Sequence, residues 1–238
     1  MLLRFRPVCP LLLVGRRFPV TLIPVSSVRA LLVVDVQRGF VTPDTEPVLE
    51  PITRSVRHVR ANGQLVVATR FHNPDPGPFR RLMGWERLSS SPEVDLVPEL
   101  VDALGPAAIV RAKDGYGALD PWMDHLLTSH GVDEVLLCGI DTDACVLATA
   151  LQLFASNRRP VVLTDLCAST GGAGAHRAGL AVLRRLIDSR QLCTWAEALG
   201  PDVGGGVSDT GRAAGERPYS SHDVTDIPDH GGRGACAP

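Results

Sequence analysis

The sequence lacks the features that mark several large classes of protein. Basic and acidic side chains nearly balance among its 238 residues, 24 against 26, so the formal net charge is -2. A charge this small gives no electrostatic reason to expect a nucleic acid or an anionic membrane as partner. The apolar runs are short, and the run at residues 11–14 is far below the roughly 20 residues that a membrane span needs. We therefore expect a small-molecule substrate, no nucleic acid and no membrane.

Paired cysteine and histidine motifs are absent as well. The six cysteines include no Cys-x-x-Cys pair, and none has a histidine at the spacing that zinc sites use. Cys138, Cys167 and Cys193 lie in or beside apolar strand-like runs, and the chain is much longer than a disulfide-stapled mini-domain. No glycine pattern fits a phosphate-binding loop. We predict free thiols, a cytoplasmic protein, and neither a metal nor a cofactor.

What the sequence does contain is an alternation of two apolar patterns. Continuous apolar runs typical of buried strands alternate with apolar residues at the three- and four-residue spacing of helix faces. The expected strands are residues 30–36, 64–69, 107–112, 135–140, 160–166 and 191–195. This alternation predicts an α/β three-layer sandwich, in which helices cover both faces of a six-stranded parallel sheet. The strand order 3-2-1-4-5-6 is taken from that fold class.

The two ends of the chain do not share this pattern. Residues 1–34 hold five arginines and no acid, and residues 200–238 are rich in glycine without apolar periodicity. We expect residues 1–27 to be a disordered Arg-rich extension, with an organelle transit peptide as the alternative, and residues 200–238 to be a disordered tail. Residues 28–199 form the expected folded domain. With 45% hydrophobic residues, the chain can bury one sizeable core.

The most informative stretch is residues 133–154, where a short strand turns sharply into a helix. Cys145 lies in the first turn of that helix, where unpaired N–H groups and the helix dipole stabilise a thiolate. The thiol is thus a candidate nucleophile. The alternative is a small buried apolar cysteine with no reactivity.

Two other residues with useful chemistry fall at the carboxyl ends of expected strands. Asp35 ends the first strand and Lys113 follows the third, as Cys145 follows the fourth. In the assumed order, strands one and four are neighbours where the order reverses, which is where parallel α/β proteins bind ligands. Taken singly, Asp35 has a structural alternative as a hydrogen-bonded buried residue, and Lys113 as an ordinary solvated lysine.

Three motifs in order then resemble the isochorismatase-like cysteine hydrolases, a superfamily that includes nicotinamidases and N-carbamoylsarcosine amidohydrolases. They are residues 32–40, Lys113 with Tyr116 three residues later, and residues 139–146. The likeness covers about residues 30–195. It implies a catalytic triad of Cys145, Asp35 and Lys113, and assembly as a homodimer or homotetramer.

The resemblance also implies a cis peptide bond in the turn before the nucleophile, between Ile140 and Asp141. Such a turn would direct the backbone N–H groups of Asp141 and Cys145 to one point, forming an oxyanion hole. Asp141 and Asp143 have alternative interpretations as helix caps or metal ligands.

Substrate contacts are expected from Phe40 and Tyr116, and from Phe71 and Trp85 in or beside the loop of residues 73–91, which we expect to cover the site. Phe79 and Leu82 are further candidates for lining an apolar pocket there. Nicotinamidases resemble one another in an Asp-x-His metal motif after the second strand. Here Arg70 replaces the aspartate before His72, which speaks against a metal and against nicotinamide as substrate.

The sequence therefore predicts a hydrolase that cleaves a C–N bond of a small amide or carbamoyl compound through a thioester on Cys145. One alternative is a vinyl-ether hydrolase acting on isochorismate, with Asp35 as proton donor and no role for the thiol. The other is a non-catalytic scaffold of the same fold.

Overall fold

The computed structural model describes residues 28–200. The extension expected at residues 1–27 and the tail expected beyond residue 200 lie outside the described residues. Within the described part, no helix is long and apolar enough to cross a membrane.

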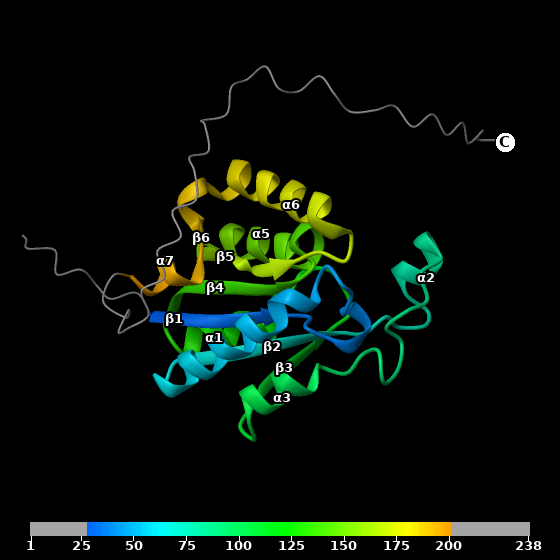
Figure 1. Cartoon of the computed structure of the whole chain (residues 1–238), viewed down its shortest axis with the longest axis horizontal. Coiled ribbons are helices and arrows are strands. Elements are labelled where there is room, and N and C mark those ends of the chain that lie inside the picture. Colours follow the sequence, from blue (N-terminus) through cyan, green and yellow to red (C-terminus); the bar gives the residue numbers. More distant parts are fainter. Residues whose placement is uncertain (1–27, 201–238) are drawn as a thin grey trace, which may run out of the picture. The chain divides into compact units, whose positions relative to one another are not determined.

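The core of the fold is a six-stranded sheet in which every pair of neighbouring strands is parallel (Figure 1). Its strands are β1 (Val28–Val34), β2 (Leu65–Phe71), β3 (Ile109–Lys113), β4 (Val132–Ile140), β5 (Arg159–Ala168) and β6 (Leu192–Cys193). Their order is β3-β2-β1-β4-β5-β6, which confirms the predicted fold and strand order. The order reverses between β1 and β4, and ligands bind parallel sheets at such a point.

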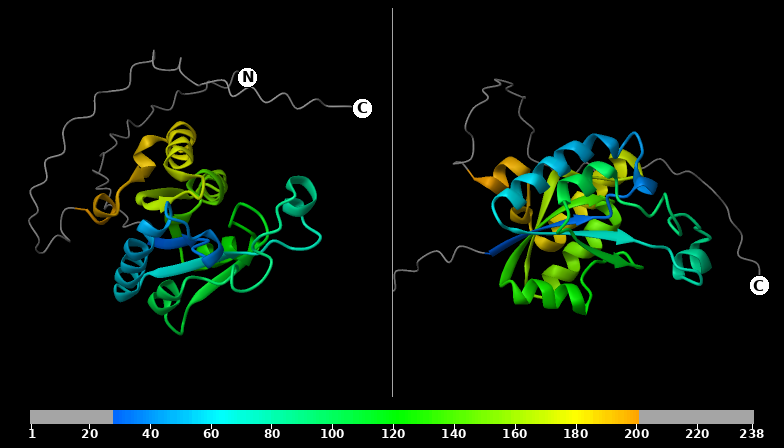
Figure 2. Two further views of the ribbon diagram at one scale, coloured as in Figure 1. Left: turned by 45° about the vertical axis from the view of Figure 1, so that its right-hand side comes forward. Right: turned by 90° about the horizontal axis from the view of Figure 1, so that it is seen from below.

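Helices cover both faces of the sheet, as Figure 1 and Figure 2 show. One face carries α1 (Leu49–Ala61), α3 (Pro98–Leu104) and α7 (Trp195–Leu199). The other carries α4 (Pro121–Ser129), α5 (Leu147–Ala155) and α6 (Gly172–Ile187). The short helix α2 (Pro78–Met83) projects beside the carboxyl ends of the strands. It interrupts the segment predicted to be a loop.

The alternation of side chains along β1 explains the two layers. Successive strand residues point to opposite faces, so Leu32 and Val34 join the cluster under α4, α5 and α6, while Leu31 and Val33 join the one under α1 and α3. All four are essentially inaccessible to solvent. Both faces must therefore be covered by helices, and the polar residues that follow the strands are left at the sheet's edge.

Gly139 is a position of close approach between β4 and β1. Its φ angle is +127°, and a Cβ atom there would lie 2.1 Å from the carbonyl oxygen of Val34. Val34 and Gly139 are paired in the sheet. A side chain at this position would push β4 away from β1 just before the chain reaches Cys145.

We expect Gly139→Ala to destabilise the fold by more than about 3 kcal/mol, because overpacking adds to the cost of a positive φ angle. Gly63→Ala is the matched control. Gly63 also has a positive φ angle, +68°, but no atom lies within 4 Å of a Cβ built there. The control should lose only about 1 to 2 kcal/mol. Urea unfolding measures both losses, and equal losses would contradict the account of the β1–β4 contact.

Candidate active site

The structure brings Asp35, Lys113 and Cys145 together at the carboxyl edge of the sheet. Asp35 directly follows β1, Lys113 is the last residue of β3, and Cys145 lies in η3 (Thr142–Val146), the helical turn after β4. The Lys113 Nζ atom is 2.6 Å from Oδ2 of Asp35 and 3.5 Å from Sγ of Cys145. A thiol, a carboxylate and an ammonium group therefore meet where the strand order reverses.

Asp35 is held in place from the neighbouring strand β2. Its side chain is inaccessible to solvent, and its backbone has a positive φ angle of 51°. The Thr69 hydroxyl donates to Oδ1 over 2.7 Å and accepts from the Asp35 N–H group over 3.2 Å. The other oxygen, Oδ2, lies 2.6 Å from the Lys113 ammonium nitrogen. Thr69 thus holds one carboxylate oxygen, and the other oxygen faces Lys113.

Lys113 is not an ordinary solvated lysine, since only 7% of its side chain is exposed. Its ammonium donates to the carbonyl oxygens of Gly115 and Tyr116, over 2.8 and 3.0 Å. It also lies 5.3 Å from the centre of the Phe71 ring. These contacts fix the charge beside Asp35 and compensate for its removal from water.

Cys145 differs from the expectation of a thiolate stabilised by its helix. Burial raises the pKa of its thiol well above the ordinary value, and the charge of Asp35 and a hydrogen bond to it raise this pKa further. The charge of Lys113 opposes these effects but does not outweigh them. At neutral pH the resting site therefore holds a thiol next to a carboxylate, which can accept the thiol proton.

The turn before Cys145 has the geometry that the sequence resemblance implied. The peptide bond between Ile140 and Asp141 is cis. The carbonyl oxygen of Asp141 accepts hydrogen bonds from the N–H groups of Ala144 and Val146, over 3.2 and 3.0 Å. These two amide groups are therefore occupied, and Cys145 lies between them.

A cavity of about 250 Å³ opens above the thiol. Its lining includes all four residues expected to contact substrate, which are Phe40, Phe71, Trp85 and Tyr116. The other lining residues are Phe79, Met83, Asp141, Ala144, Cys145 and Thr170. Leu82 is not among them, because 68% of it is exposed on the outside of α2. Half of the lining residues are aromatic, so the cavity suits a small ligand with an apolar surface.

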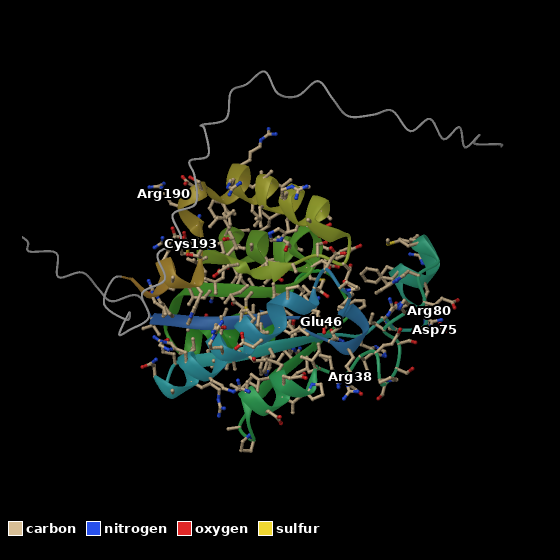
Figure 3. All side chains as sticks on the ribbon, viewed as in Figure 1. Arg38, Glu46, Asp75, Arg80, Arg190 and Cys193 are labelled. Atoms are coloured by element: carbon tan, nitrogen blue, oxygen red, sulfur yellow. The ribbon has the colours of Figure 1, made fainter. Side chains whose placement is uncertain are left out.

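Ion pairs hold the segment around α2 over this cavity. Arg80 Nη1 lies 3.7 Å from a carboxylate oxygen of Asp75 and 4.0 Å from one of Glu86. Figure 3 shows Arg80 and Asp75 beside one another at α2. The amide group of the buried Asn73 adds hydrogen bonds to the carbonyl oxygens of Trp85 and Arg87. The segment predicted to cover the site is therefore fixed at both ends.

The residues after β2 do not fit a metal site of the nicotinamidase type. Arg70 is exposed, and the exposed His72 has its Nε2 atom 3.0 Å from the carbonyl oxygen of Ser89. No group of three or more histidine, cysteine or acidic side chains among residues 28–200 could hold a metal ion.

Fold and site together define a parallel α/β protein in which a thiol, a carboxylate and an ammonium group meet at the reversal of the strand order. The family model of the isochorismatase domain matches residues 29–196. The chain belongs to this family of hydrolases.

Comparisons with individual proteins agree with that assignment. The chain is 33% identical over 150 residues to the streptothricin hydrolase of Streptomyces noursei; the match covers 59% of this chain and 54% of that protein. The chain thus spans about half the length of this curated relative.

Two solved structures share the fold. An isochorismatase-like hydrolase from Alkaliphilus metalliredigens has a TM-score of 0.64 and 21% identity, with 72% of this chain and 97% of that one covered. N-carbamoylsarcosine amidase from Thermoplasma acidophilum has a TM-score of 0.61 and 23% identity, with 70% and 94% covered.

We expect Asp35→Asn to lower the pKa of the Cys145 thiol, because both the charge and the hydrogen bond of Asp35 raise that pKa. The thiolate should then appear at lower pH than in the parent protein. Ultraviolet absorbance of the thiolate across a pH titration, with the Cys145→Ala protein subtracted, measures the shift. A titration at unchanged or higher pH would show that Asp35 does not act on the sulfur.

Proposed function

We propose that this protein is a cysteine hydrolase that cleaves the C–N bond of a small amide or carbamoyl compound through a thioester on Cys145. The contact of its thiol with Lys113, itself paired with Asp35, at the floor of an aromatic cavity supports the proposal most directly. Assembly as a homodimer or homotetramer belongs to the same proposal.

In the first step Asp35 accepts the thiol proton while the sulfur of Cys145 attacks the substrate carbonyl carbon. Negative charge develops on the carbonyl oxygen, and the backbone N–H groups of Asp141 and Cys145 stabilise it. Asp35 then gives the proton to the leaving nitrogen, the C–N bond breaks, and ammonia or an amine departs. A thioester remains on Cys145.

In the second step Asp35 removes a proton from water, and the water oxygen attacks the thioester carbonyl carbon. The C–S bond breaks, the acid product leaves, and the proton on Asp35 returns to the sulfur. Lys113 serves both steps, because its charge lowers the pKa of the Cys145 thiol and so favours the thiolate. Removing one such charge-stabilising group costs roughly a hundred- to a thousand-fold in rate.

An ammonia-release screen against small primary amides and carbamoyl compounds tests the proposal. We expect Cys145→Ser to lose roughly a thousand-fold or more of the activity, because the reaction requires a sulfur nucleophile. Cys193→Ser is the matched control. Cys193 is another free, partly buried cysteine, and Figure 3 shows it far from α2.

The control should keep the parental rate. Parental turnover by Cys145→Ser would contradict the assignment of the nucleophile. Conversion of isochorismate by the Cys145→Ala protein would instead favour vinyl-ether hydrolysis, which needs no thiol.

A further inference from the structure

Asp141 contributes the charged side chain in the lining of the cavity, next to the Cys145 thiol. Its Oδ1 atom accepts the Thr170 N–H group over 2.6 Å, and its Oδ2 atom accepts the Thr170 hydroxyl over 2.9 Å. Both donors are uncharged. Since a carboxylate offers about four acceptor positions, roughly half of its capacity is left for a ligand. No ion pair involves Asp141 within residues 28–200.

The charges around the cavity do not balance. Asp35 and Lys113 offset one another, whereas no ion pair within the described residues involves Asp141. Burial raises the pKa of the Asp141 carboxyl, whereas the hydrogen bonds from the Thr170 N–H and hydroxyl groups lower it and so favour the ionised form. The nearby His176 adds no compensating charge at neutral pH, because burial lowers its pKa. When ionised, the Asp141 carboxylate therefore gives the cavity lining a negative charge that no basic residue of the lining offsets.

Five other residues of the cavity lining are aromatic: Phe40, Phe71, Phe79, Trp85 and Tyr116. Phe40 stacks on Trp85 with ring centres 6.4 Å apart, and Phe79 packs edge-on against Phe71 and Tyr116 at 5.0 and 5.1 Å. The face of an aromatic ring is negative and attracts organic cations, particularly methylated ammonium groups. An aromatic cavity alone also suits a neutral apolar group. The carboxylate without a cationic partner is what favours a positive charge over a neutral group.

We propose that Asp141 and these aromatic rings form a subsite for a positively charged organic group, so that the preferred substrate is a small amide carrying an alkylated ammonium. This inference rests on the proposed amide hydrolysis. Asp141 thereby selects the substrate through its side chain, apart from the role given to its backbone N–H group. Anionic compounds are disfavoured by the same carboxylate.

Three amides of similar size test this preference, and two of them have the same shape. Betaine amide carries a trimethylammonium group, 3,3-dimethylbutanamide has a tert-butyl group in its place, and malonamic acid carries a carboxylate. NMR titration of the Cys145→Ala protein, which cannot consume them, gives their dissociation constants. We expect betaine amide to bind roughly ten-fold more tightly than its neutral isostere, and malonamic acid least tightly.

Two substitutions in that background locate the preference. Asp141→Asn should reduce the preference for betaine amide over its isostere to about two-fold or less, since it removes the charge and keeps the shape. Trp85→Leu should weaken betaine amide binding more than isostere binding. Asp143→Asn is the matched control, because it removes the same charge from the same turn but outside the cavity lining. It should keep most of the preference.

The inference is overturned if the neutral isostere or malonamic acid binds as tightly as betaine amide, if none of the three binds, or if Asp143→Asn acts as strongly as Asp141→Asn. Its failure is distinguishable from failure of the proposed function. Preferential binding of betaine amide, with no C–N bond cleaved by the parent protein, would refute the hydrolase alone. Amide hydrolysis without any charge preference would refute the subsite alone.

Discussion

The buried ion pair between Asp35 and Lys113 is the interaction on which the site depends. Taking two charges out of water is costly, and their mutual attraction compensates only if further polar contacts satisfy both partners. Here Thr69 donates to the carboxylate, and the carbonyl oxygens of Gly115 and Tyr116 accept from the ammonium. With the pair in place, Asp35 can accept a proton next to the sulfur. In the proposed reaction, the Lys113 charge would offset both the buried Asp35 anion and the negative charge that develops on Cys145.

The order of the strands makes this pair possible. Asp35 follows β1 and Cys145 follows β4, and these strands are neighbours at the reversal of strand order. Lys113 ends β3, one strand beyond β2, so only a long side chain could reach the other two. The close pairing of Gly139 with Val34 keeps β1 and β4 near enough for the three groups to meet. The order and pairing of the strands thus position the three side chains of the site.

Much of this arrangement could be predicted from the sequence, for physical reasons. Buried strands in a parallel sheet are apolar on both faces, so the interruption at Asp35 and the polar residues after the third and fourth strands stood out. The strand order came from the fold class, and the roles of the three residues came from the resemblance to the isochorismatase-like cysteine hydrolases. Helix α2 was missed although Pro78 begins it and Gly84, with a φ angle of +66°, follows it, a pattern typical of a short helix.

Other features depend on tertiary packing and leave little trace in the sequence. Thr69 is a single polar residue in β2, and its role depends on Asp35 of the neighbouring strand. The direction of the Asp141 side chain is set by Thr170, which is distant in the sequence. The helix position of Cys145 predicted a stabilised thiolate, but burial and Asp35 dominate its pKa. The position of Cys145 in a helix turn indicates that the helix lowers the thiol pKa. The net shift of that pKa also depends on burial and on Asp35, which only the packed structure shows.

The central claim is that the sulfur of Cys145 carries the acyl group of the substrate during turnover. The most direct measurement is mass spectrometry of the protein quenched in acid during the hydrolysis of an amide, followed by peptide mapping. The account predicts a mass increase equal to the acyl group on the peptide containing Cys145, absent from the Cys145→Ala protein. Continued turnover with the acyl group on another residue, or with an acyl adduct of the same kind in the Cys145→Ala protein, would contradict it.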